Sequence, residues 1–280
     1  MEASPKTATV ACVPCGLEAY VCPVCKGFLD QENNALRCSA CSKVYPVEKN
    51  IPDFLLERLS HSKDPVLRRM TAIDRMARIY ETNLWYPIVL AVYGGIHSPS
   101  LAQLIRIVSL KIQSTNGRVL EVACGPGTFG RRIASPSKEV FGIDVSGRML
   151  RQGAAYAAKE GITNVHFARA RVEALPFENR LFDAVTCCGS LHLFEDTIVA
   201  LREIARVMKP AAILSVFTFT AGDAGILKSR RVREWSFKNQ GLHVFELPEM
   251  DGYLSASGFQ DFQAEVSGSI LTFSARKRAD

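Results

Sequence analysis

Apolar positions recur with two different periods along the chain. Between residues 57 and 116 they return every three or four positions, which predicts amphipathic helices. From residue 118 onward, apolar runs of strand length alternate with helical stretches, which is typical of an α/β fold. The pattern therefore predicts a helical segment followed by a larger α/β domain.

The helical segment holds three apolar stretches. The first is formed by residues at three- and four-residue steps: Leu67, Met70, Ile73, Met76, Ala77 and Tyr80. The second runs from residue 84 to 92, and the third from residue 100 to 113. These helices can pack on the core or form a lid over a ligand, and the two roles are compatible. As a lid, Tyr80, Trp85 and Tyr86 would wall an apolar pocket.

The α/β part contains a clear succession of elements. Helices are expected at residues 196–208 and 247–258, and strands at residues 118–124, 139–145, 181–188 and 213–219. Residues 261–266 and 270–277 are expected to close the domain as an antiparallel strand pair.

Composition and charge exclude some classes of protein. The chain has 280 residues, 48% of them hydrophobic and 22% charged, which is enough apolar material for a substantial core. Its net charge of +6 is too weak by itself to indicate nucleic-acid binding. The excess is local, in residues 228–233 and 276–278, which form either a solvated surface or a site for an anionic acceptor or an RNA backbone.

The N-terminus lacks an apolar run of signal-peptide type, and the apolar stretches at residues 85–92 and 211–219 are too short to cross a bilayer. We therefore expect a cytoplasmic protein without a transmembrane segment. In a reducing compartment, CxxC pairs indicate metal or redox sites rather than disulfides. The sequence does not define the oligomeric state.

Six of the nine cysteines lie in the first 41 residues. Cys22, Cys25, Cys38 and Cys41 form two CxxC pairs, and the residues between the pairs read as a hairpin with an Asn-Asn turn. Four thiolates make a closed tetrahedral zinc site without room for a catalytic water, so the expected zinc is structural. A third pair, Cys12 and Cys15, has three possible roles: a loose thiol pair, which we favour, a substitute for one CxxC turn, or part of a second metal site.

The residues after the last of these cysteines strengthen the zinc interpretation. A Tyr-Pro pair at residues 45–46 is followed by Ile51-Pro52 and by Phe54-Leu55. With the four cysteines, residues 22–55 resemble the Trm112-like zinc-ribbon domain. The resemblance implies a zinc-stabilised accessory module.

A glycine-rich turn follows the first strand of the α/β domain. Gly125-Pro126-Gly127 opens a GxGxxG pattern, and the second strand ends in Asp144, which is placed to take both hydroxyls of a ribose. This loop alone is compatible with either a dinucleotide or S-adenosylmethionine. A short-chain dehydrogenase would need Tyr-x-x-x-Lys, and Tyr156 and Lys159 have the wrong spacing.

Further segments distinguish the two possibilities. Glu121 lies inside the first strand, residues 172–177 read VEALPF, and residues 189–194 read GSLHLF, before a helix, Lys209-Pro210 and another strand. This succession over residues 117–277 resembles class I S-adenosylmethionine-dependent methyltransferases, of the branch containing small-molecule and quinone methyltransferases. The resemblance implies a Rossmann-like, seven-stranded α/β sheet with an antiparallel last strand.

The resemblance also implies roles for residues around the cofactor. Gly125 and Gly127 would admit its methionine part, Glu121 would organise the ammonium end, and Asp144 would hold the ribose. The adenine would be lined by Val145 and Met149 and edged by Arg171, Val172 and Glu173. The methyl group that is transferred would lie near Cys188 and Gly189. Arg171 departs from the family, which often has an acid there, because a guanidinium cannot accept from the adenine amino group.

His192 is the expected general base, because it follows the strand at residues 181–188, at the edge where ligands bind. A histidine simply packed under the next helix is the alternative. We expect in-line methyl transfer to oxygen or carbon of a small molecule. A methyltransferase acting on an rRNA or tRNA base, with the zinc ribbon holding RNA, and a non-catalytic partner protein remain open. RNA is not favoured, since the basic residues of the ribbon are offset by acidic ones.

Together these observations predict four regions. Residues 1–18 are expected as a flexible tail and residues 19–57 as the zinc ribbon. Residues 58–115 are expected as a helical linker or lid, and residues 116–280 as the S-adenosylmethionine-binding domain.

Overall fold

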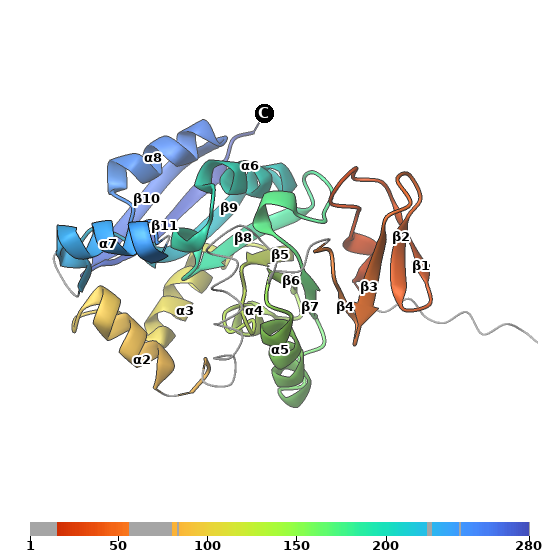
Figure 1. Cartoon of the computed structure of the whole chain (residues 1–280), viewed down its shortest axis with the longest axis horizontal. Coiled ribbons are helices and arrows are strands. Elements are labelled where there is room, and N and C mark those ends of the chain that lie inside the picture. The colour runs from red at the N-terminus through yellow and green to blue at the C-terminus, as the bar shows by residue number, and fades with distance from the viewer. Residues whose placement is uncertain (1–15, 56–79, 83, 223–225, 241, 280) are drawn as a thin grey trace, which may run out of the picture.

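The computed structural model describes residues 16–55, 80–82, 84–222, 226–240 and 242–279. Cys12, Cys15 and the helix expected near residues 67–79 lie outside the described residues. Within them, two β-sheets lie side by side, a small one at the N-terminal end and a large one flanked by helices (Figure 1).

The small sheet is antiparallel and ordered β1-β2-β3-β4. A short 3₁₀ helix, η1 (Leu17–Ala19), precedes the strands β1 (Leu29–Glu32), β2 (Ala35–Cys38), β3 (Val44–Glu48) and β4 (Ile51–Pro52). The predicted hairpin with its Asn33-Asn34 turn is confirmed, since Glu32 pairs with Ala35 and Asn33 takes a φ of 52°. Leu17 and Glu18, expected in the tail, lie in η1, where Leu17 is buried.

The described part of the large sheet has seven strands in the order β10-β11-β9-β8-β5-β6-β7. Strands β5 (Gly117–Val122), β6 (Lys138–Asp144), β7 (Val165–Arg169), β8 (Phe182–Cys188) and β9 (Met208–Phe219) are parallel. Strand β11 (Ile270–Lys277) runs antiparallel to both β9 and β10 (Phe259–Ser267). The predicted α/β sheet with an antiparallel last strand is confirmed.

Helices cover both faces of this sheet. One face carries α3 (Leu101–Lys111), α4 (Gly130–Ile133) and α5 (Gly147–Lys159), and the other carries α6 (Thr197–Val207) and α8 (Leu247–Ala256). Side chains fix where these helices begin: Ser100 forms a capping box with Gln103, and Asp196 accepts from two backbone N–H groups of α6. Short 3₁₀ turns η5 (Val172–Ala174) and η6 (Leu191–Leu193) follow β7 and β8.

A second group of helices lies at the carboxyl ends of the parallel strands. Helix α2 (Trp85–Val89) continues into a π-helical turn, η4 (Leu90–Gly94), and lies near η7 (Ile226–Lys228) and α7 (Arg230–Gln240) (Figure 1). Contacts between η4 and η7 join residues far apart in sequence. Among the described helices, none has both the length and the apolar composition that crossing a bilayer requires.

The small sheet shares a hydrophobic core with the large one. Tyr20 packs its ring 5.1 Å from that of Phe177 and 5.4 Å from that of Phe54. The backbone N–H of Phe54 donates to the carbonyl of Arg169 at 2.8 Å, beside β7. The side chain of Lys26 donates to the carbonyl of Leu175 at 2.9 Å. Because apolar packing and backbone hydrogen bonds both cross the boundary, the two sheets are expected to unfold together.

Candidate functional site

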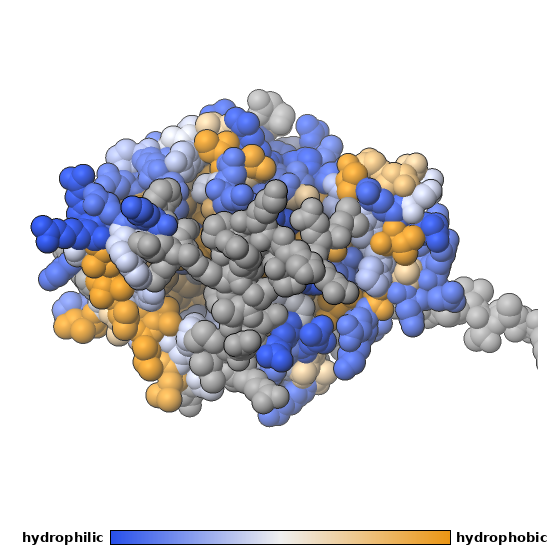
Figure 2. Space-filling model, in the orientation of Figure 1, coloured by the Kyte–Doolittle hydropathy of each residue, from blue (hydrophilic) through white to orange (hydrophobic). Residues whose placement is uncertain are grey.

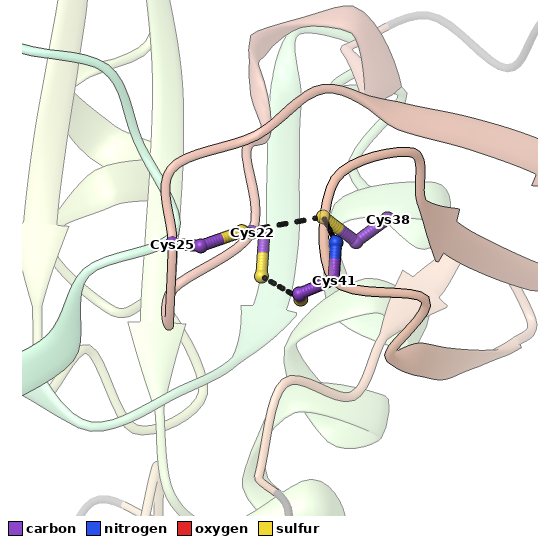
Figure 3. Close-up of side chains that lie close together, drawn as sticks. All are labelled: Cys22, Cys25, Cys38 and Cys41. Carbon is purple, nitrogen blue, oxygen red and sulfur yellow. Dashed lines mark hydrogen bonds between the residues drawn. The ribbon is translucent and has the colours of Figure 1, made fainter.

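Four thiols converge in the small sheet. Cys22 and Cys25 come from the loop before β1, Cys38 ends β2, and Cys41 lies in the loop between β2 and β3 (Figure 3). Their sulfur atoms all lie within 4.8 Å of one another, with Cys25 to Cys38 at 3.4 Å and Cys22 to Cys41 at 3.6 Å. A tetrahedron of thiolates about 2.3 Å from zinc has edges of roughly 3.8 Å. The predicted ligand set therefore fits a structural zinc ion.

The two cysteine loops have the same backbone geometry. In the first, Lys26 takes a φ of 59° and its N–H donates to the carbonyl of Cys22. In the second, Ser42 takes a φ of 59° and its N–H donates to the carbonyl of Cys38. The buried hydroxyl of Tyr45 lies 3.1 Å from the sulfur of Cys22, where it can donate to a thiolate and hold that ligand in place.

A cavity of about 230 Å³ opens at the carboxyl ends of the central strands of the large sheet. One side is formed by Gly125, Ser146 and Gly189 from the loops after β5, β6 and β8, with Asp144 at the end of β6 and Met149 in the first turn of α5. Its other side is apolar and aromatic, and includes Tyr80, Trp85 and Tyr86, as the lid interpretation expected. Ligands of open α/β sheets bind at this edge.

Asp144 organises the polar side of the cavity. One carboxylate oxygen accepts from the N–H of Gly125 at 2.8 Å, and the other accepts from the N–H of Ser146 at 2.8 Å. Ala123 and Gly125 turn the chain here with φ values of 50° and 54°. A side chain on Gly125 would be strained at this φ, and glycine also leaves the backbone open to the cavity. The acid at the end of β6 thus ties the glycine turn to the start of α5.

Glu121 lies behind the glycine turn, on the α4 side of the sheet. It is almost fully buried, and one carboxylate oxygen accepts from the N–H of Gly130 at 2.8 Å. Burial raises its pKa to about 8, although the bond from Gly130 acts in the opposite direction. The residues that line the cavity do not include Glu121, so its role toward a cofactor ammonium stays a prediction.

The raised pKa of Glu121 predicts a pH dependence of stability. The folded, cofactor-free protein keeps the proton up to about pH 8, whereas an unfolded chain releases it near its ordinary value of 4.5. The free energy of unfolding should therefore fall as pH rises, by about 2 kcal/mol between pH 6 and pH 8. Glu121→Gln, which keeps the acceptor for Gly130, should flatten this dependence in urea unfolding.

A matched control is Glu265→Gln on the exposed part of β10, which should leave the dependence as it is in the unmodified chain. An unchanged slope in Glu121→Gln would contradict the assignment of this titration to Glu121.

His192 lies in the wall of the cavity, in η6. Its Nδ1 is 3.2 Å from the hydroxyl of Thr218, and its ring meets that of Phe219 edge-on. Burial lowers its pKa to about 4, so the imidazole is neutral near pH 7. Cys188 also lines the cavity, and burial raises the pKa of its thiol well above the ordinary value. A neutral base and a neutral thiol therefore face the same space.

Several expected cofactor residues do not line this cavity: Gly127, Val145, Arg171, Val172 and Glu173. A Cβ on Gly127 would lie 2.8 Å from the ring of Phe167, so close packing accounts for this glycine. Arg171 pairs with Glu173 and with Glu195 instead of pointing into the cavity. The adenine contacts assigned to these residues stay predictions.

Sequence reasoning missed most of the apolar wall. The residues it did not identify are Val89, Leu90, Tyr93, Phe217, Phe219 and Leu227. One signal was available for Phe217 and Phe219, because both lie at the carboxyl end of a predicted strand. Val89, Leu90, Tyr93 and Leu227 come from α2, η4 and η7 above the sheet, where sequence periodicity does not show which side faces a cavity.

Comparisons with known proteins agree with this geometry. Residues 119–211 match the family described as a methyltransferase domain, and residues 17–50 match the Trm112p-like protein family. An uncharacterized chloroplastic methyltransferase of Arabidopsis thaliana is 27% identical over 288 residues, which cover 93% of this chain and 78% of that protein.

Two bacterial relatives match the α/β part more closely. The ubiquinone/menaquinone biosynthesis C-methyltransferase UbiE of Rhizobium rhizogenes is 38% identical over 124 residues, covering 43% of this chain and 48% of that protein. The uncharacterized methyltransferase YcgJ of Bacillus subtilis is 35% identical over 92 residues, covering 33% of this chain and 36% of that protein. The matched region thus spans between a third and a half of these relatives.

Solved structures share the fold. The YcgJ protein of Bacillus subtilis superposes with a TM-score of 0.53 at 20% identity, over 62% of this chain and 99% of that chain. Phosphoethanolamine N-methyltransferase 2 of Haemonchus contortus, in complex with S-adenosyl-L-methionine, gives a TM-score of 0.58 at 18% identity, over 74% of this chain and 60% of that chain.

Residues 119–211 therefore match a methyltransferase domain, and the large sheet has the fold of solved methyltransferases. More particularly, a Trm112-like region with a four-cysteine site precedes this domain.

Proposed function

We propose that the protein transfers a methyl group from S-adenosylmethionine to an oxygen or carbon atom of a small, largely apolar acceptor. One observation carries the proposal: a single cavity runs from the glycine turn and Asp144 to a wall of aromatic and aliphatic side chains. Cofactor and acceptor can therefore meet in one space.

The polar side of the cavity fits the cofactor. Asp144 offers a carboxylate for the ribose hydroxyls, and the backbone of Gly125 borders the space for the methionine part. Met149 lies on the same wall and is suited to the apolar face of adenine. Gly189 is the neighbour of Cys188 at the end of β8, on the way to the apolar side. When bound, S-adenosylmethionine supplies the electrophilic methyl group.

The apolar side fits an acceptor with little charge. Aromatic residues of α2 and η4 line it together with Phe217 and Phe219 of β9, and Asp144 is the one residue with a charged side chain among the described residues that line the cavity. A ring or an alkyl chain would bury favourably there, whereas a phosphate would lack a cation. Positioning in such a site supplies effective molarities on the order of 10⁵ M or more.

His192 is suited to receive the proton of an acidic acceptor. Its imidazole is neutral because burial holds the pKa near 4, and the hydroxyl of Thr218 orients the ring through Nδ1. Removal of a proton from a hydroxyl or an activated carbon would leave the electron pair that attacks the methyl carbon. The curated C-methyltransferase relative supports a carbon acceptor of this kind.

RNA methylation is supported less well. The described residues that line the cavity include no lysine or arginine. We call residues 16–55, which contain the four-cysteine site, the zinc module. In it, Lys26 bonds to Leu175 and Glu203, and Arg37 pairs with Glu32. A non-catalytic role is also less well supported, because the glycine turn and Asp144 are already arranged around a cavity.

Methyl transfer from labelled S-adenosylmethionine to apolar phenols, quinols, polar amines and structured RNA tests the proposal. We expect turnover with the apolar hydroxyl or carbon acceptors. His192→Gln should lower kcat by about tenfold or more while leaving the affinity for S-adenosylhomocysteine and the KM nearly unchanged. His97→Gln is the matched control, since His97 is exposed and does not line the cavity.

Turnover of RNA but of none of the small acceptors would contradict the proposal. Equal kcat values for His192→Gln and the unmodified chain would contradict the assignment of His192 as the general base.

A further inference from the structure

Helix α2 and its π-helical continuation are apolar on both sides. Residues 84–94 read LWYPIVLAVYG, without a charged residue. The inner side, with Tyr86 and Leu90, lines the cavity and is buried. The outer side exposes Leu84 by 69%, Ile88 by 57% and Val92 by 42%, at steps of four residues. A helix that is apolar all round is normally buried on all sides, so the exposed stripe calls for a partner.

The apolar stripe continues beyond the helix. Ile96, in the loop after η4, is 88% exposed. Ile226 of η7, which contacts η4, is 41% exposed, and Trp235 of α7 is 55% exposed. Figure 2 shows the apolar surface gathered over α2, next to hydrophilic surface over α7. We call the exposed side chains of Leu84, Ile88, Val92, Ile96, Ile226 and Trp235 the α2 face.

Basic residues border the α2 face. Residues 226–240 contain five lysines and arginines and one acidic residue. Lys228, Arg231 and Lys238 are exposed, and Arg230 is exposed beside Glu234, its partner at i+4. Exposed aliphatic side chains and a tryptophan flanked by cations are the combination that binds the interface of an anionic bilayer.

We propose that the α2 face is a docking surface for an anionic lipid membrane. The aliphatic side chains and Trp235 enter the headgroup region, and the cations of α7 contact the phosphates. The same helix that would lie on the lipid also walls the cavity with its inner side, so the cavity lies directly beneath the contact. Delivery of an apolar acceptor from the lipid rests on the proposed function, whereas membrane binding does not.

Co-sedimentation of the full chain with vesicles tests the surface. Vesicles of phosphatidylcholine with phosphatidylglycerol should bind the chain, and binding should weaken with salt, because screening reduces the attraction of the cations. Ile88→Gln with Val92→Gln should lower the partition coefficient about tenfold or more. Arg231→Gln and Lys238→Gln should each lower it about fivefold on anionic vesicles.

Matched controls lie on α6, where Val199 is 41% exposed and Arg202 is also exposed. Val199→Gln and Arg202→Gln should bind as the unmodified chain does. S-adenosylhomocysteine binding should be the same in all variants, which separates this test from that of the proposed function.

Three results would overturn the proposal: no binding to anionic vesicles at low salt, binding that the α2 and α7 variants leave unchanged, or a lipid-free dimer that dissociates on Ile88→Gln with Val92→Gln. The last would assign the α2 face to a second copy of the chain.

Discussion

Asp144→Ala is expected to lower the affinity for S-adenosylhomocysteine at least about a hundredfold. The substitution removes the carboxylate that would hold two ribose hydroxyls, and hydrogen bonds to a charged group contribute about 1.5–3 kcal/mol each. It also frees the N–H groups of Gly125 and Ser146, so the glycine turn loses its link to α5. Isothermal titration calorimetry measures the change.

Two further variants separate the loss of the ribose contact from a general effect on the fold. Asp144→Asn retains one acceptor for the backbone and should lose less affinity than Asp144→Ala. Asp183→Ala is the matched control, because Asp183 also accepts from a backbone N–H, that of Arg118, but lies at the other end of the strands. Near-equal affinities of Asp144→Ala and the unmodified chain would refute the ribose assignment.

The second large effect is expected from Cys38→Ser. Metal analysis of the unmodified chain should give about one zinc per chain, and the variant should lose it, because serine does not replace a thiolate in a four-sulfur site. Zinc binding supplies much of the folding free energy of such small modules, so the loss should cost several kcal/mol. Since the small sheet shares its core with the large one, thermal unfolding should shift as a single transition.

Cys187→Ala provides the matched control. Cys187 is a buried thiol of β8 outside the four-cysteine cluster, and its removal should leave the zinc content unchanged. A fully folded, metal-free protein with unchanged melting temperature would contradict the zinc assignment.

Features set by local sequence were predictable. The four zinc ligands follow from CxxC spacing, because each pair needs only one tight turn. The hairpin at Asn33-Asn34, the glycine turn at Gly125 and the acid at the end of β6 likewise depend on neighbouring residues. The antiparallel β10 and β11 were marked by the Ser267-Gly268-Ser269 turn between two strand-like segments.

Features set by distant residues were not predictable in the same way. The ring of Phe167 leaves no room for a side chain at Gly127, and Glu195 forms an ion pair with Arg171. The spacing of residues within one segment does not encode either contact. The outer side of α2 reads like a core helix in sequence, because its apolar residues do not reveal that one side remains exposed. The packing of Tyr20 on Phe177 depends on the fold of both sheets at once.

The contact between Phe54 and Arg169 has a consequence for self-association. Strand β7 ends the order of the large sheet, and an uncovered edge strand offers unpaired N–H and C=O groups to a second chain. The segment after β4 occupies this place, with Phe54 donating to the carbonyl of Arg169 and Asp53 pairing with its guanidinium at 2.8 Å. The zinc module thus covers the carboxyl end of this edge strand, and zinc binding would stabilise the cover against edge-to-edge pairing with a second chain.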